Sequence, residues 1–290
     1  MNALGPIEIL FLLAPVAVVP LAMRLTAAPE DATPALSAAR RLQPWAALAV
    51  VASFLVRRGP SAAVLAGVWL VLTLLVAYHG WQRLGRTVAE VAMSAGCLML
   101  PIGGGWLVLS RLGVGAFGFE EPLILLTAVH FHYAAYATLV LVGRAGRDLR
   151  ESRAYRLIAG GAMAGPPLLA AGITFSPRLE IVAAGIIVLA VSGLGALTLV
   201  RIVPRVPAAA RALLALSSVS AFAGMACALA YAVGEFTGIG IISLGQMARI
   251  HGPLNALGFV LAGLIGWTLA SRSHPPTMVA AGCNLRPPSL

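Results

Sequence analysis

Nine long apolar runs, separated by short segments that contain arginine, proline or glycine, constrain this sequence more than any other feature. The runs fall near residues 5–23, 42–56, 61–80, 87–109, 122–143, 157–175, 179–200, 212–234 and 247–270. A helix that crosses the hydrocarbon core of a bilayer needs about 20 mostly apolar residues. The runs therefore predict an all-α, polytopic transmembrane bundle of about nine helices, in which the short second run is the least secure span.

The composition supports this fold class. Of the 290 residues, 60% are hydrophobic and only 10% are charged, whereas a soluble domain carries about 25% charged residues. A soluble domain of this length leaves about a quarter of its unfolded surface exposed, so it could not hide so many apolar side chains. We therefore expect the lipid bilayer to be a partner of this chain.

The distribution of arginine predicts an orientation. All 20 basic residues are arginines and the formal charge is +10, which by itself can indicate nucleic-acid binding. Here the arginines lie in the short connections between apolar runs. With the N-terminus outside, inward-facing segments carry 15 arginines and outward-facing ones carry 5, as the positive-inside rule requires. We predict an outer N-terminus, a cytoplasmic C-terminus and no nucleic-acid partner.

The chain is expected to form a single transmembrane helical domain over residues 1–272. Residues 29–41 are predicted to form a polar loop. Residues 273–290 are rich in proline and have no hydrophobic period, so they are predicted to be a disordered tail. The five tryptophans, Trp69 among them, lie mostly near the ends of runs and are expected to anchor the membrane interfaces.

Ionisable side chains inside a membrane are costly, so each is a candidate for function. One stretch, residues 120–136, concentrates them: it contains Glu120, Glu121, His130, Phe131, His132, Tyr133 and Tyr136. Pro122 is expected to be the first helical residue. His130 and His132 would point about 200° apart on a regular helix. They therefore cannot easily bind one metal ion, and one is expected to face the bundle interior and the other a neighbouring helix.

A second stretch begins with Glu235 and continues with Arg249, His251 and Asn255 in the last apolar run. His251 and Asn255 are four residues apart and share one helix face. The predicted topology places both stretches, together with Glu180, in the outer half of the membrane. We predict that helices five and nine bring these groups to one protein-enclosed site. Glutamates at helix starts and buried histidines also serve as caps and hydrogen-bond partners, which is the alternative for each residue taken alone.

Two segments of this sequence, residues 121–133 and 248–259, resemble the YndJ-like family of bacterial membrane proteins. The resemblance implies a multi-pass protein of a bacterial inner or plasma membrane. It also associates the chain with membrane-bound terpenoid cyclisation.

Three classes of function remain open from the sequence. The first is an enzyme that protonates a lipophilic substrate, most plausibly an isoprenoid alkene or epoxide, to start cyclisation, because a carboxylic acid in an apolar pocket stays protonated near neutral pH. The catalytic candidates are Glu120, Glu121, Glu235, His130, His132 and His251, and the substrate-binding candidates are Phe131, Tyr133, Tyr136, Arg249 and Asn255. This reaction requires no cofactor and no metal.

The second class is a proton-coupled transporter or a membrane sensor, in which the same glutamates and histidines relay protons. The third class is a metal or haem protein that uses His130 or His132 together with His251. The sequence leaves the substrate, the reaction, the catalytic acid and the oligomeric state undetermined.

Overall fold

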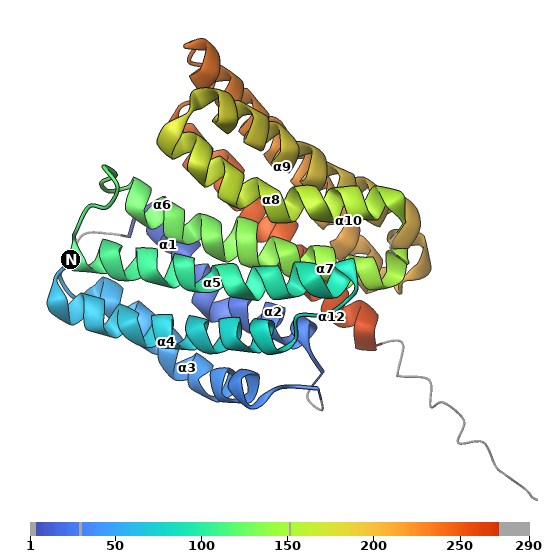
Figure 1. The fold of residues 1–290 in the computed structure, drawn as a ribbon, viewed down its shortest axis with the longest axis horizontal. Coiled ribbons are helices and arrows are strands. Elements are labelled where there is room, and N and C mark those ends of the chain that lie inside the picture. Colours follow the sequence, from blue (N-terminus) through green and yellow to red (C-terminus); the bar gives the residue numbers. More distant parts are fainter. Residues whose placement is uncertain (1–3, 29–30, 151, 273–290) are drawn as a thin grey trace, which may run out of the picture.

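A computed structural model describes residues 4–28, 31–150 and 152–272 (Figure 1). This part of the chain is all-helical and folds into nine helical stretches, so the predicted fold class is confirmed. In chain order they are α1 (Pro6–Leu13), η1 (Ala14–Val18) and α2 (Val19–Thr26); α3 (Pro34–Leu55); α4 (Pro60–Gln82); α5 (Val88–Leu112); α6 (Leu123–His130), η2 (Phe131–Ala137) and α7 (Thr138–Leu149); α8 (Arg153–Phe175); α9 (Pro177–Leu197), η3 (Thr198–Ile202) and η4 (Val203–Arg205); α10 (Ala208–Thr237); and α11 (Leu244–Gln246), η5 (Met247–His251), η6 (Leu254–Leu261) and α12 (Ala262–Arg272). The predicted tail over residues 273–290 lies outside the described residues.

Eight of these stretches are long and apolar enough to cross a membrane, and α3 is the ninth. Its 22 residues would reach across a bilayer, but its first half carries Arg40, Arg41 and Gln43. The prediction of a polar loop over residues 29–41 is wrong from Pro34 onward. Thr33 caps α3 by accepting a hydrogen bond from the backbone N–H of Leu36, and a proline in the first turn favours helix at this point.

Local sequence explains other helix starts. Thr87 and Glu90 form a reciprocal capping box at the start of α5, and Ser176 caps α9 by accepting from the backbone N–H of Leu179 at 3.4 Å. Pro122 is the N-cap of α6, so this helix begins at Leu123, one residue later than predicted. The orientation of the bundle in the membrane stays a prediction. We call the end with the first residues of α1 the outer end.

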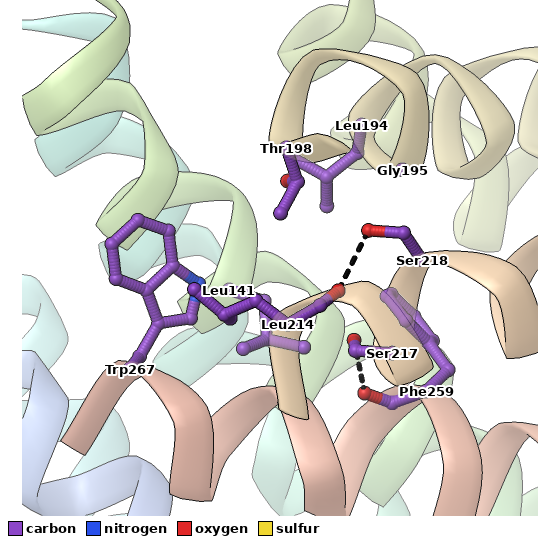
Figure 2. Close-up of a pocket in the computed structure, with 9 residues that line it drawn as sticks. All are labelled: Leu141, Leu194, Gly195, Thr198, Leu214, Ser217, Ser218, Phe259 and Trp267. Carbon is purple, nitrogen blue, oxygen red and sulfur yellow. Dashed lines mark hydrogen bonds between the residues drawn. The ribbon is translucent and has the colours of Figure 1, made fainter. Parts of the chain in front are cut away.

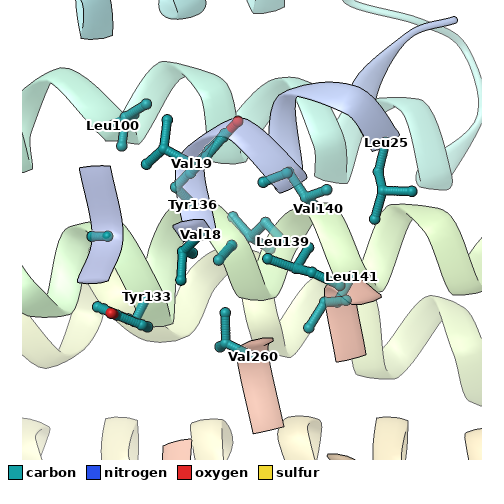
Figure 3. Close-up of a cluster of buried hydrophobic side chains, with 14 of the residues drawn as sticks. Val18, Val19, Leu25, Leu100, Tyr133, Tyr136, Leu139, Val140, Leu141 and Val260 are labelled. Carbon is teal, nitrogen blue, oxygen red and sulfur yellow. The ribbon is translucent and has the colours of Figure 1, made fainter. Parts of the chain in front are cut away.

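The first, fifth and last helical stretches contact one another, and the fifth is the most buried of the eight candidate spans. The helices α8, α9 and α10 pack on one another along one side, and α3, α4 and α5 pack side by side on the other (Figure 1). The buried apolar core combines Val18 and Val19 of the first stretch, Leu100 of α5, Leu139 of α7 and Val260 of the last stretch (Figure 3).

Several helices change to wider π-helical winding midway, and three such segments, η1, η2 and η6, contact one another. Side chains bind carbonyl oxygens of these segments: Gln43 donates to Pro15 at 2.8 Å, Thr138 to Tyr133 at 2.9 Å and Ser217 to Phe259 at 2.7 Å. π-Helical turns inside longer helices are frequent at functional sites. Most of the predicted site residues lie in or beside these segments.

Candidate functional site

Two carboxylates from different helices line one pocket of about 130 Å³ at the outer end of the bundle. Glu180 lies in the first turn of α9 and Glu235 in the last turns of α10. The other lining residues are Pro177, Ile181, Ala232 and Phe236, all apolar. Tyr231 precedes Glu235 by one helical turn and interacts electrostatically with both carboxylates, which also interact with each other. The pocket therefore combines acidic groups with an apolar wall.

His251 and Asn255 form a second polar group, in the π-helical part of the last stretch. The Nδ1 of His251 lies 2.9 Å from the carbonyl oxygen of Gly224 in α10. Because a carbonyl only accepts, Nδ1 carries the ring proton. The Asn255 amide lies 3.1 Å from that Nδ1 and donates to the His251 carbonyl at 2.9 Å. This bonding leaves the His251 Nε2 as an acceptor without a hydrogen bond from the described residues.

Glycine at position 224 is required for this contact. A Cβ there would lie 2.7 Å from the Asn255 amide nitrogen, so any larger residue would displace the Asn255 side chain.

His130 is exposed, donates from Nδ1 to the Leu126 carbonyl at 2.8 Å, and interacts electrostatically with His251. The structure thus brings His130, His251 and Asn255 into one neighbourhood.

His132 has a different environment. It is completely buried, its Nε2 accepts a hydrogen bond from the Trp69 indole N–H at 2.9 Å, and its Nδ1 donates to the Ala128 carbonyl at 2.8 Å. Phe11 meets the ring edge-on with centroids 5.1 Å apart. Both ring nitrogens are therefore hydrogen-bonded, and the bond to Trp69 joins α4 to the fifth helical stretch. The interpretation of Trp69 as an interfacial anchor is wrong, since this side chain is completely buried.

The predicted substrate-binding aromatics also lie inside the bundle. Tyr133 is buried and donates its hydroxyl to the Leu10 carbonyl at 2.8 Å. Tyr136 is completely buried with no hydrogen-bond partner for its hydroxyl, and Phe131 is half-buried. None of the three lines the Glu180–Glu235 pocket.

Glu121 belongs to a polar network at the outer end. It accepts hydrogen bonds from the Ser110 hydroxyl and from the backbone N–H of Leu125, and Arg58 lies 3.7 Å from it. Glu120 and Arg249 are exposed at the same end. Among the described residues, no hydrogen bond or ion pair joins this network to His132 or to the pocket, so the predicted single site is divided into separate groups.

A stripe of polar and small residues on α10 connects some of these groups. Ser217, Ser220, Gly224, Tyr231 and Glu235 recur at three-, four- and seven-residue intervals, which places them on one helix face. A small cavity of about 10 Å³ beside Thr198, Ser217 and Ser218 continues the stripe inward (Figure 2). Such a volume is about enough for one water molecule.

A comparison with known protein families identifies the chain. The model of the family described as "YndJ-like protein" matches residues 9–259. This chain belongs to the YndJ-like family. A relative, "Uncharacterized membrane protein YndJ" from Bacillus subtilis (strain 168), is 32% identical over 207 residues, which cover 70% of this chain and 38% of the relative. The chain thus spans well under half of that relative's length, and no solved structure matches it.

Family membership confirms the resemblance expected from residues 121–133 and 248–259, and with it a multi-pass membrane protein. In this YndJ-like protein, the described residues contain no group of three or more His, Cys, Asp or Glu side chains that could hold a metal ion.

Three residues of these groups were missed as catalytic or binding candidates in the sequence. The predicted topology places Glu180 in the outer half of the membrane but assigns it no role. Tyr231 stands one turn before Glu235, and this i, i+4 spacing was the available signal. Trp69 gave no signal, because only the packing of α4 against the fifth helical stretch brings it to His132.

Proposed function

We propose that this YndJ-like protein carries out acid–base chemistry on a lipophilic small molecule in the Glu180–Glu235 pocket. The specific reaction proposed is cyclisation of an isoprenoid alkene or epoxide. The observation that carries the proposal is the pocket itself, which is lined by one glutamate from α9, one glutamate from α10 and otherwise apolar residues. This choice of substrate is the one associated above with the resemblance to the YndJ-like family.

The chemistry follows from the carboxylate pair. One of the two carboxyl groups, in its protonated form, supplies a proton to the substrate. That proton is transferred to the terminal alkene or to the epoxide oxygen of the substrate, and a carbocation forms. A second double bond of the substrate attacks the cation and closes a ring. Loss of a proton from a neighbouring carbon to the carboxylate pair then restores the acid, and the net reaction is an isomerisation.

The size and walls of the pocket suit one end of such a substrate. An apolar cavity of about 150 Å³ in another protein binds benzene, so a pocket of about 130 Å³ has room for one five-carbon isoprene unit. Phe236, the aromatic residue of the pocket wall, would stabilise the developing cation through its π-system. The rest of the chain would remain in the lipid.

The other predicted site residues lie outside the pocket lining and have supporting roles in this proposal. His251 has a free Nε2 and would exchange protons with the pocket, with Asn255 fixing its orientation. His130, Arg249, Glu120 and Glu121 are candidates for the entrance at the outer end. Phe131, His132, Tyr133 and Tyr136 would shape the protein around the site.

The experiment uses membranes from cells that express the full chain, incubated in D₂O with geranylgeraniol or its terminal epoxide. The expected result is a cyclic product, with deuterium on carbon when the alkene is the substrate, since the starting proton comes from an exchangeable carboxylic acid. Glu180→Gln and Glu235→Gln should each lower product formation by at least tenfold, because positioned acids contribute about 10²–10⁴-fold to rates. Asp31→Asn is the control, because Asp31 is exposed in the connection before α3 and has no role in the proposed site, and it should keep full turnover. A cyclic product formed equally by all variants would remove the proposal.

The polar stripe on α10 favours a second candidate, proton-coupled transport or sensing. Ser217 and Ser220, the His251 contact at Gly224, and the Tyr231–Glu235 pair lie along one helix face. Intramembrane chains of ionisable and hydroxyl groups mark proton relays. Proteoliposomes loaded with a pH-sensitive dye test this candidate: acidification driven by an imposed proton gradient should depend on Glu235 and His251. If liposomes that contain the wild-type chain acidify no faster than protein-free liposomes, proton transport is contradicted.

A further inference from the structure

Two buried polar groups remain unpartnered at a site that the proposed function does not use. The Nε of Arg40 in α3 and the hydroxyl of Tyr136 in η2 are buried and have no hydrogen-bond partner. Buried polar groups in proteins are almost always hydrogen-bonded, so each exception requires an explanation. Arg40 binds the Met23 carbonyl of α2, and Tyr136 lies beside Val19, one turn earlier on the same helix (Figure 3). Both exceptions therefore lie against α2, and the two residues interact electrostatically with each other.

The rest of the Arg40 guanidinium is held by backbone oxygens. Its Nη2 donates to the carbonyls of Met23 at 2.9 Å and Ala27 at 2.7 Å. These carbonyls belong to the carboxyl end of α2, where a cation is favoured. This bonding holds the guanidinium in place, while its Nε–H is left as a free donor.

The charge around this site is positive. The groups that interact electrostatically with Arg40 are Tyr136, Arg24 and His79. The ion pairs between described residues are Arg58–Glu121 and Arg144–Asp148, so within this part of the chain no carboxylate pairs with Arg40. A partly buried cation without a counter-ion is unfavourable in a membrane protein.

We infer that the Arg40 Nε–H and the Tyr136 hydroxyl together bind a small inorganic anion of the size and charge of chloride. The anion accepts a hydrogen bond from each group and supplies the negative charge that the protein side chains do not provide. Cys97 is buried nearby and interacts with Tyr136, and its S–H is a further weak donor. Figure 3 shows the Tyr136 ring among Val18, Val19 and Leu100, so the remaining wall is apolar.

This site is separate from the Glu180–Glu235 pocket. It joins α2, α3 and η2, whereas the pocket lies between α9 and α10. An anion here would link the first two helical stretches to the fifth and so stabilise the folded state by mass action.

The test measures the thermal unfolding midpoint of the purified full chain in detergent, in sodium chloride, sodium bromide and sodium gluconate at equal ionic strength. We expect the wild-type midpoint to be higher in chloride and bromide than in gluconate by roughly 2–4 °C, the shift for a modest stabilisation of a chain of this size. The increase should saturate with halide concentration. No difference between the salts would overturn the inference and leave an ordered water as the only occupant.

Tyr136→Phe separates anion binding from general salt effects. This variant removes only the hydroxyl, and it should lose the difference between chloride and gluconate. In gluconate it should be as stable as the wild type or more stable, because removing an unsatisfied buried hydroxyl costs nothing. Tyr78→Phe is the matched control, since Tyr78 is exposed on α4, and it should keep the wild-type difference. An equal salt dependence in Tyr136→Phe would refute the site.

A second measurement does not depend on a variant that folds. Line broadening of the ³⁵Cl NMR signal by the wild-type protein reports bound chloride directly and should be reversed by bromide. Absence of excess broadening would contradict the inference even if Tyr136→Phe cannot be purified.

Discussion

His132 and His251 both lie in π-helical parts of the bundle, but they use their rings differently. His132 is completely buried, and Trp69 and the Ala128 carbonyl occupy both of its nitrogens. His251 is half-buried, and only its Nδ1 is bound, to the Gly224 carbonyl. A histidine with both nitrogens bound joins helices, whereas one with a free Nε2 retains an atom for proton transfer. The intramembrane position alone therefore does not identify a reactive histidine.

The largest expected effect is that of His132→Ala. The substitution leaves a cavity in the core and leaves the Trp69 indole N–H unsatisfied, which together should cost about 3–5 kcal/mol of stability. Thermal unfolding of the purified chain in detergent measures the loss. His130→Ala is the control, because His130 is exposed and should tolerate the change within about 0.5 kcal/mol. Equal effects of the two variants would show that His132 does not join the helices as described.

Gly103→Ala should disturb the same contact more mildly. A Cβ on Gly103 would lie 2.7 Å from the His132 Nδ1 and 2.9 Å from the Phe131 Cβ. Overpacking of this kind costs about 1–3 kcal/mol. Gly105→Ala provides a matched helical control: nothing lies within 4 Å of its added Cβ, so alanine should stabilise the helix by roughly 0.5–1 kcal/mol. The comparison would fail if both variants shifted the unfolding midpoint in the same direction.

The sequence predicted the features that depend on neighbouring residues in the chain. Apolar length predicted the helical stretches, and the two-residue spacing predicted that His130 and His132 diverge, as their exposed and buried positions confirm. The start of α3 was missed, because Arg40 and Arg41 lower the hydropathy of its first turns although Thr33 and Pro34 favour a helix there. Membrane hydropathy thus predicts spans better than it predicts helix ends.

The division of the predicted site depends on contacts between distant helices. The arginine pattern predicted that Glu180, Glu235 and His251 share the outer half, but it could not predict which of them face one another. The hydrogen bonds between Trp69 and His132, and between Gly224 and His251, depend on which face each helix turns toward its neighbours in the bundle. A single sequence contains little information on such rotations.

His251 should contribute little to the free energy of unfolding but should react rapidly with a histidine-modifying reagent. His251→Ala removes one hydrogen bond from a half-buried side chain and should cost about 1 kcal/mol. Diethylpyrocarbonate, which attacks unprotonated imidazole nitrogens, should modify His251 and the exposed His130 before His132. Peptide mass spectrometry after timed labelling measures the order. Early modification of His132 would erase the distinction between the two histidines.

The smallest effect is expected at the Glu180–Glu235 pocket, where no contact with another side chain fixes either carboxylate among the described residues. Each substitution removes the repulsion between two charged carboxylates, so Glu180→Gln or Glu235→Gln should each stabilise the chain at alkaline pH by up to about 0.5 kcal/mol, a value limited by solvent screening. The double variant should gain no more than either single one, because the first substitution already removes the repulsion. At a pH well below the ordinary range of carboxyl groups, the gain should vanish. Strictly additive effects at both pH values would mean that the carboxylates act independently, and then their pairing, on which the cyclisation mechanism depends, would have no physical basis.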